Sequence, residues 1–461
     1  MTVHALAGLF ALNVVFLVAG AALLWLVRGF ETWIDVARLA GLAYLTGAVV
    51  TCSLWTLMVI AEIPFSLWVV LVVPIGVTVG SALGASRRGR PLPRRGSLGA
   101  GNSIYLTAVG IAAAAVLLVG FFRTSRLAGL YEWDAWAFWV PKAEAIYFSG
   151  ELDVGFLKAF HNPSYPPLVP VLDAAAFHVM GAPDVVTLHV QYWLLGVGFV
   201  WALAGLLAER VPAWILWPFV LLLLIAPRIG RRFQTAEADF LLQYMFVIAA
   251  LLMVVWILDR ERWRLVVATI LMCGMVLTKR EGMLLAAVLV GAALLTSARE
   301  WRTTWPALGV VGVIVVSVAA PWRIWYIAHG VGSEGPASGG LDPTENTTRL
   351  WPSLRLALDV LFSSDYWSVI IPVAVGALIL AALVRAYTLT VFFGALLVLL
   401  TLGGGWITWA IPELPITQEL GGNPIVRFMG AAALLCAAAG PMLLAATWSA
   451  VNRGTAKADR P

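Results

Sequence analysis

Charged residues are scarce in this chain of 461 residues, and their scarcity decides the class of protein. Only 12% of the residues are Asp, Glu, Lys or Arg, while 61% are hydrophobic and the mean hydropathy is +0.91. Soluble domains contain about 25% charged residues. The composition therefore excludes a soluble protein and indicates a polytopic membrane protein. The formal charge of +5 is explained by basic cytoplasmic loops, so no nucleic-acid partner is expected.

Cysteine is also rare, and the familiar cofactor motifs are missing. Cys52, Cys273 and Cys436 lie in apolar runs and match neither a metal-site spacing nor an evident disulfide. The sequence contains no phosphate-cradling GxxxxGK[ST], no GxSxG elbow, no HExxH and no paired CxxC. No cofactor and no metal site are therefore predicted, although Glu132-x-Asp134 leaves divalent metal dependence open. A substrate must reach this protein already activated, from within the membrane.

Long apolar runs are what the chain has in abundance. Each run must be helical where it crosses lipid, because no water is present there to satisfy an open backbone. We expect about 13 transmembrane helices, and the fold class is all-α. The expected spans are 5–27, 39–61, 64–84, 102–122, 187–208, 212–227, 239–258, 265–278, 283–297, 306–321, 367–384, 388–410 and 427–450.

The short basic loops predict the orientation of these spans. The densest cluster, RRGRPLPRR from Arg87 to Arg95, is expected in the cytoplasm because Lys and Arg are retained there. Alternation from that loop places the N-terminus outside and the C-terminus inside. We therefore expect an integral protein of the bacterial plasma membrane.

Four regions follow from the order of spans and loops. Residues 1–100 contain three additional N-terminal spans and the basic cytoplasmic loop. Residues 101–321 contain seven spans and a long outer loop at 123–186. Residues 322–366 form a Gly- and Ser-rich outer loop, expected to be mobile, with an amphipathic helix. Residues 367–461 contain the last three spans and a cytoplasmic tail.

The outer loop is too aromatic and too apolar for a flexible linker. WDAWAFWVPKAEAIYFSG, from Trp133 to Gly150, has apolar residues at helical spacing and predicts an amphipathic helix in the membrane interface. YPPLVP, from Tyr165 to Pro170, predicts a rigid turn whose prolines block regular structure. LDAAAFHVMG, from Leu172 to Gly181, predicts a second short interfacial helix.

Two carboxylates stand between tryptophans at the start of this loop. Glu132 and Asp134 are two residues apart and would point apart on a helix, so one of them is expected to enter a site. Asp134 lies deeper in the aromatic run, partly shielded by Trp133, and is placed to accept a proton from a hydroxyl. Glu132 is the reserve candidate. The alternative is that the acids face water while the tryptophans form an interfacial aromatic belt.

Further candidate substrate contacts lie later in the same loop. Lys142 comes about two helical turns after Asp134, where it could bind a phosphate or extend to the aqueous interface. His161 and Tyr165 flank the proline-rich turn and could supply hydrogen-bond donors and an aromatic platform for a sugar. His161 could equally cap the loop. Trp133 completes this group.

Two groups of cations are expected near the outer face. In LTKREG, Lys279 and Arg280 separate two short apolar runs and predict an anion site, with Glu281 holding one of the two cations. In NPIVRFMG, Arg427 opens the last span and could clamp a phosphate with two donors. The alternative is that these residues are interfacial anchors.

With these motifs in place, the chain resembles the GT-C superfamily of integral membrane glycosyltransferases over about 100–450, and its protein-mannosyltransferase-like members in particular. Seven spans with a long first outer loop resemble the core of that family, and Asp134 matches the position of its catalytic base. YPPL at Tyr165 resembles the family's YPP turn, KREG at Lys279 its basic-acidic-glycine step, and Arg427 its phosphate-binding arginine. The three preceding spans and the lack of an adjacent Asp-Glu pair are departures.

The resemblance implies an inverting hexosyl- or pentosyltransferase that acts on the extracytoplasmic face. Its partners would be a polyprenyl-phosphate sugar donor, an acceptor glycan, lipid or protein, and membrane lipids. Lys279, Arg280 and Arg427 would bind the donor phosphate. The alternative function is a transporter or flippase of a lipid-linked sugar, because short broken helices near 265–297 with charges at the membrane are also typical of transporters.

Overall fold

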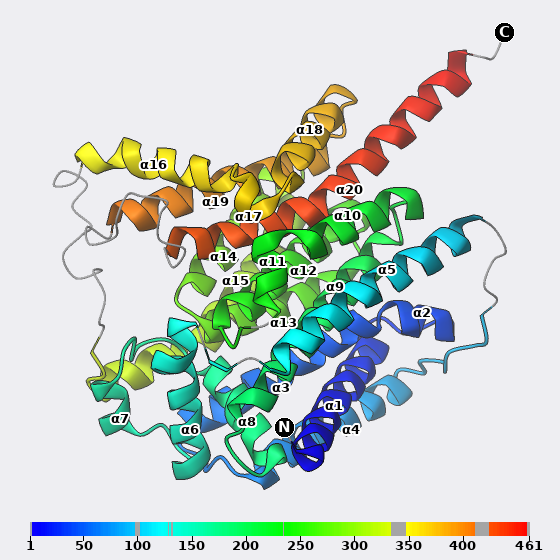
Figure 1. Ribbon diagram of the computed structural model, residues 1–461. Coiled ribbons are helices and arrows are strands. Elements are labelled where there is room, and N and C mark those ends of the chain that lie inside the picture. The colour runs from blue at the N-terminus through cyan, green and yellow to red at the C-terminus, as the bar shows by residue number, and fades with distance from the viewer. Residues whose placement is uncertain are drawn as a thin grey trace.

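The computed structural model describes residues 2–96, 102–127, 129–130, 132–233, 235–332, 347–410 and 424–458. Within these ranges the regular elements are helices, apart from one isolated bridge between Thr32 and Arg94. The long helices run side by side in a bundle (Figure 1). Helices α6 (Val140–Ser149), α7 (Val154–Ala159) and α8 (Leu168–Met180) gather at one end of it, here called the α8 end. Helix α2 (Trp33–Arg38) lies at the opposite end, here called the α2 end.

Among the described residues, nine helices are long and apolar enough to cross a membrane, or ten if one pair bent by 114° forms a single span. These helices confirm the expected all-helical, polytopic membrane character. The nine are α1 (Val3–Val27), α3 (Ala40–Ile60), α4 (Leu67–Arg87), α5 (Asn102–Ser125), α9 (Val185–Leu207), α12 (Ala238–Asp259), α15 (Trp301–Ala328), α19 (Tyr387–Ala410) and α20 (Pro424–Ala458).

Four shorter helices coincide with the other expected spans. They are α10 (Ala213–Ile225), α13 (Arg262–Thr278), α14 (Glu281–Thr296) and α18 (Ile370–Leu383), with 13 to 17 residues each. A helix of that length extends ~20–26 Å, somewhat less than the ~30 Å hydrocarbon core. It therefore stays a prediction that these four helices cross the membrane and that the protein has 13 transmembrane helices.

One helix is longer than the span expected from the sequence. Helix α15 begins before the expected span 306–321 and continues to Ala328, with Pro321 inside the helix. The expected mobility of 322–366 concerns in part residues 333–346, which lie outside the described residues. The amphipathic helix expected in that region is α16 (Thr347–Leu361), and the four-residue α17 (Ser364–Trp367) joins it to α18.

The outer loop also differs from the sequence-based expectation. Its first helix begins as a π-helical turn, η1 (Ala135–Trp139), and continues directly into α6. Helix α8 offers no apolar face to lipid, because nearly all its side chains are buried against neighbouring helices; its place in the membrane interface stays a prediction. Pro170 does not block α8 but lies in its first turn, where the missing N–H needs no partner in the helix.

The N-terminal helices are packed tightly into the body of the protein. A Cβ atom on Gly20 of α1 would lie 1.7 Å from the carbonyl oxygen of Ala43 of α3, so only glycine permits this approach. The Asn13 amide donates a hydrogen bond to Gln191 of α9 (2.7 Å), and the Tyr44 hydroxyl donates one to Asn13 (2.5 Å). Helix α12, apolar on all faces, is buried at the centre.

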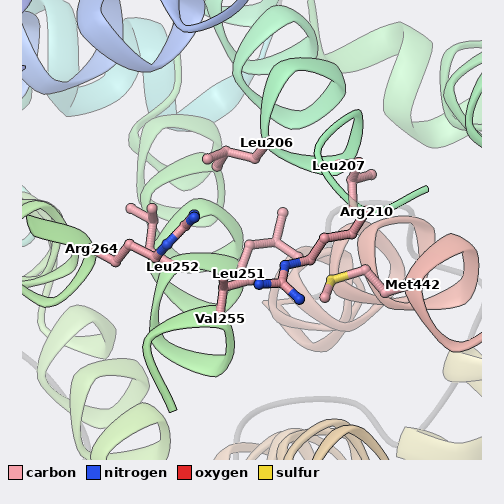
Figure 2. Close-up of a pocket in the computed structure, with 8 residues that line it drawn as sticks. All are labelled: Leu206, Leu207, Arg210, Leu251, Leu252, Val255, Arg264 and Met442. Atoms are coloured by element: carbon pink, nitrogen blue, oxygen red, sulfur yellow. The ribbon is translucent and has the colours of Figure 1, made fainter. Parts of the chain in front are cut away.

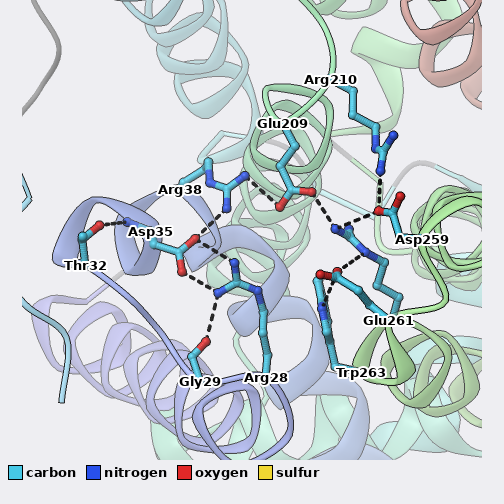
Figure 3. Close-up of polar contacts among 11 residues, drawn as sticks. Arg28, Gly29, Thr32, Asp35, Arg38, Glu209, Arg210, Asp259, Glu261 and Trp263 are labelled. Atoms are coloured by element: carbon cyan, nitrogen blue, oxygen red, sulfur yellow. Dashed lines mark hydrogen bonds and ion pairs between the residues drawn. The ribbon is translucent and has the colours of Figure 1, made fainter. Parts of the chain in front are cut away.

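A network of ion pairs joins the helix ends at the α2 end (Figure 3). Asp35 pairs with Arg28 and Arg38, and Arg38 also reaches Glu209 at 2.8 Å. Arg264 approaches the same Glu209 at 2.9 Å. Beside it, Arg210, Arg264 and apolar side chains enclose a cavity of about 10 Å³ (Figure 2), which has room for about one water molecule. This end of the molecule is therefore held together by charge pairs.

Candidate active site

Four charged residues from separate elements meet at the α8 end. Asp134 immediately precedes η1, Asp239 lies in the first turn of α12, Lys279 lies in the break between α13 and α14, and Arg427 lies in the first turn of α20. Asp134 and Arg427, 293 residues apart in sequence, form a direct ion pair. The Lys279 ammonium donates a hydrogen bond of 2.9 Å to Asp239 Oδ1. Residues that are far apart in the sequence therefore lie together in one polar cluster.

The break between α13 and α14 brings Lys279 inward. Helix α13 ends at Thr278, Lys279 adopts an extended backbone, and α14 begins at Glu281. A Cβ on Gly282 would lie 1.9 Å from the Met275 carbonyl oxygen, so the close return of α14 onto α13 requires glycine here. The Lys279 side chain is consequently only 6% exposed.

A second set of polar side chains holds Arg427 in place. The Gln243 amide donates a hydrogen bond of 2.7 Å to the Arg427 carbonyl oxygen. Arg232 donates one of 2.8 Å to the Gln243 oxygen and lies over the Phe240 ring. Gly430 leaves the space for this pair, since a Cβ there would lie 2.8 Å from the Arg232 guanidinium. The backbone at the start of α20 is therefore anchored to α12.

The cluster borders a cavity of about 120 Å³ with two different walls. The polar wall is formed by Tyr165, Asp239, Gln243, Lys279, Glu281 and Arg427, and the apolar wall by Leu242, Leu285, Ile407, Phe428 and Ala431. Three buried polar atoms of the lining residues have no hydrogen-bond partner: Asp239 Oδ2, Glu281 Oε2 and Arg427 Nε. Buried polar groups usually are satisfied, so these three indicate a place for a polar ligand. The two walls suit a molecule with a polar head and an apolar tail.

The charges around the cavity are balanced. Four cations, Arg232, Lys279, Arg280 and Arg427, face four acids, Asp134, Glu237, Asp239 and Glu281. Besides Asp134, the Arg427 guanidinium has Asp239 at 3.8 Å and Glu237 at 3.9 Å. These residues therefore contain no excess of cations over acids, and Lys279 and Arg427 each have a carboxylate in direct contact.

Burial and neighbouring charges shift the pKa values of two groups next to the spans. Burial, assisted by the charge of Asp239, raises the pKa of Glu237 to about 7, although Arg427 opposes the shift. Burial alone would lower the pKa of the Lys279 ammonium, but Asp239 and Glu281 outweigh it and raise that pKa. Lys279 is therefore charged at neutral pH, whereas Glu237 is close to half protonated.

Several candidates from the sequence do meet at this cavity. Asp134, Lys279, Glu281, Arg427 and Tyr165 all line it or contact a lining residue. The Tyr165 ring stacks on Trp139 with ring centres 5.7 Å apart. Two others lie nearby without lining it. Arg280 sits 5.7 Å from the centre of the Tyr165 ring, and Glu132 is half-buried and adds to the negative potential at Glu237.

Three other candidates point elsewhere. Lys142 is buried and donates a hydrogen bond of 2.5 Å to the Asn162 carbonyl, so it neither lines the cavity nor extends to the aqueous interface. It borders a separate cavity of about 10 Å³, which shares only Tyr165 with the larger one. His161 is exposed and contacts the Trp133 ring edge-on at 5.4 Å, and Trp133 itself is 48% exposed.

Three further members of the cluster, Arg232, Glu237 and Asp239, belong to the charge-rich segment RIGRRFQTAEADF, which the sequence offers as a weak candidate to contact an acceptor or to pair its own charges. No spacing linked that segment to Asp134 or Arg427, and Gln243 was missed altogether. In the described ranges, no group of three or more His, Cys, Asp or Glu could hold a metal ion. The acids surround a guanidinium and an ammonium instead.

No protein-family model, no curated protein and no solved structure matches the chain.

Proposed function

We propose that this protein is an inverting membrane glycosyltransferase of the GT-C type, which moves a sugar from a polyprenyl-phosphate donor to an acceptor hydroxyl. The observation that carries the proposal is the direct contact of Asp134 with Arg427 beside a two-walled cavity. A base for the acceptor and a cation for the donor's phosphate thus stand side by side. The proposal includes 13 crossings, an outside N-terminus, a cytoplasmic C-terminus and a reaction at the outer face.

The cavity supports a lipid-linked donor in particular. Phosphate and sugar would lie against Lys279 and Arg427, whose remaining hydrogen-bonding capacity includes the unpartnered Arg427 Nε. The prenyl chain would leave past Leu285 and Phe428 on the apolar wall. Arg280, over the Tyr165 ring, would stabilise the phosphate at longer range.

The reaction follows from this placement. Asp134 removes the acceptor's proton while the acceptor oxygen forms its bond to the anomeric carbon. The bond from that carbon to the phosphate oxygen breaks on the opposite side, so the configuration is inverted. The phosphate leaves with the electron pair, and Lys279 and Arg427 stabilise its charge. A positioned general base accelerates such a step by about 10²–10⁴-fold.

The test is the Asp134→Asn variant, purified in detergent and supplied with a panel of polyprenyl-phosphate sugars. The donor is chosen by extracting the lipid that co-purifies with the wild-type protein and identifying its sugar by mass spectrometry. We expect the wild type to transfer or hydrolyse one donor and Asp134→Asn to be slower by about 10²–10⁴-fold. Glu132→Gln is the matched comparison: a loss there, with Asp134→Asn unimpaired, assigns the base to Glu132. Wild-type rates in both variants would refute the proposal.

The alternative, transport of a lipid-linked sugar, is less well supported. Asp239 and Arg427 lie in the first turns of α12 and α20, at the ends of the spans, whereas transporters place such groups near mid-depth. Proteoliposomes that move a lipid-linked sugar across the bilayer without altering it would favour the alternative.

A further inference from the structure

We infer that the Asp134–Arg427 ion pair is a latch that the donor itself opens: the donor's phosphate takes Arg427, displaces Asp134 and so releases it to act as the base. This inference rests on the proposed function, and it adds an order of events to it. Without a donor, the two groups that the reaction needs neutralise each other.

The closed latch buries Asp134 and occupies one of its two carboxylate oxygens, Oδ2. Its side chain is 7% exposed, and its carboxylate is in direct contact with the Arg427 guanidinium. A hydroxyl can transfer its proton only to an oxygen that it can reach within hydrogen-bond distance. While Arg427 contacts Oδ2, that oxygen cannot accept a proton from an acceptor or from a water molecule.

Asp134 is the acid around Arg427 that an incoming anion would displace. Asp239 has a second partner, since Lys279 holds it at 2.9 Å, and Glu237 stands 3.9 Å from the guanidinium without a direct hydrogen bond. Across the part of the chain that the structure describes, Arg427 is the only polar side chain that bonds to the Asp134 carboxylate.

Arg427 is in turn held where it is. Gln243 bonds to its carbonyl oxygen, so displacement moves the acid rather than the start of α20. Arg427 lines the cavity, and its Nε–H has no hydrogen-bond partner. A phosphate could therefore accept one hydrogen bond from this Nε–H and a second from the guanidinium N–H that now bonds to Asp134. Asp134 stands at the entry to a π-helical turn, a rare and less regular backbone often found at functional sites.

The exchange conserves charge. A polyprenyl-phosphate sugar is a phosphodiester with a single negative charge, and it replaces the single charge of Asp134 at Arg427. The buried cluster therefore keeps its balance, which matters because an unpaired charge in this setting is costly. The expected kinetic order is donor first and acceptor second, and free water is not activated in between.

The first test measures binding of farnesyl phosphate, a prenyl phosphate without sugar, to the full-length protein in detergent. Asp134→Asn should bind it about tenfold more tightly or better, equivalent to ~1.4 kcal/mol, because Arg427 is then free. An ordinary substrate contact would show weaker binding on substitution. Glu132→Gln removes a nearby charge that does not touch Arg427, so less than about a twofold change is expected. Farnesol, which has no charge, should bind wild type and Asp134→Asn alike.

A second measurement follows the accessibility of the Asp134 carboxylate in the wild-type protein, so it does not depend on how a variant folds. Carboxyl labelling with a carbodiimide and a glycine ester, followed by peptide mass spectrometry, reports whether Asp134 is accessible. Farnesyl phosphate should raise labelling of Asp134 several-fold and farnesol should not. Asp239, held by Lys279, serves as the internal control and should stay unlabelled.

The outcomes separate the latch from the proposed function. Loss of transfer by Asp134→Asn, together with unchanged or weaker binding of farnesyl phosphate and no gain in labelling, overturns the latch and leaves the function standing. Transfer by Asp134→Asn at the wild-type rate overturns the latch, and it overturns the proposed function as well when Glu132→Gln also transfers at the wild-type rate. Tighter binding, increased labelling and lost transfer together support both.

Discussion

The buried pair of Lys279 and Asp239 offers the most direct measure of how the cluster is held together. Its atoms are 2.9 Å apart, and the side chains are only 6% and 8% exposed. Lys279→Met leaves Asp239 with Arg427, at 3.8 Å, as its nearest remaining cation. Removing one partner of a buried pair costs ~3–5 kcal/mol, because the other charge stays buried without compensation. Since Arg427 offsets part of this, we expect about 3 kcal/mol less stability for the single variant.

The double variant Lys279→Met/Asp239→Leu should recover most of that loss. Replacing both members of a buried pair with apolar groups is often neutral, so its stability should lie within ~1 kcal/mol of the wild type. Reversible unfolding by SDS in mixed micelles gives the four free energies of the double-mutant cycle. Arg355 and Asp359, 4.0 Å apart and 74% and 51% exposed, form the matched control pair. Their coupling should stay below ~0.5 kcal/mol. A loss below about 1 kcal/mol in Lys279→Met, or a double variant no better than the sum of its singles, would refute the reasoning.

Three further outcomes are expected. Gly282→Ala places a Cβ 1.9 Å from the Met275 carbonyl and should destabilise the protein by ~1–3 kcal/mol, seen as a lower thermal midpoint in detergent; an unchanged midpoint contradicts the packing argument. Glu237, with its pKa raised from 4.5 to about 7, binds more protons folded than unfolded, so wild-type stability should fall as pH rises through this range. Between pH 5 and 8, the unfolding free energy of the wild type should fall by up to ~1.4 kcal/mol per pH unit, and this slope should be absent in Glu237→Gln. Equal slopes in the two proteins would contradict the assignment. Arg264→Leu breaks the 2.9 Å contact with Glu209 at the α2 end and should cost ~2 kcal/mol in unfolding experiments while leaving farnesyl phosphate affinity unchanged; weakened binding would show that the two ends are coupled.

The helices were predictable because lipid leaves the backbone few alternatives. A long apolar run in a membrane must satisfy its peptide groups internally, so the 13 expected runs all coincide with helices. The burial of helix α8 among other helices was not predicted, although its sequence carried a signal. The sequence is apolar on nearly every face, which is typical of a buried helix. Its one acid, Asp173, is buried and accepts hydrogen bonds from Tyr192, a contact that no local pattern reveals.

Part of the candidate site was predictable from residues that stand out locally. Lys279 and Arg427 are cations at the ends of apolar runs, and Asp134 is an acid among tryptophans. Lys142 stood out in the same way, yet it bonds to the Asn162 carbonyl and leaves the cavity to others. A local pattern identifies an unusual residue, whereas its partner is determined by how distant helices pack.

If the cluster binds an anion as we propose, its acids show that an excess of positive charge is not needed as a signal for such a site in a membrane protein. A bare cation at the depth of Lys279 or Arg427 would carry a large desolvation cost in the empty protein. The fold avoids this cost by placing Asp239 beside Lys279 and Asp134 beside Arg427. Under the function and the latch that we propose, an anionic substrate binds by exchange with one of these acids. Such a site would then be sought in sequence as acids and bases in matched numbers at the ends of spans, and the substrate would replace the acid with the fewest other partners.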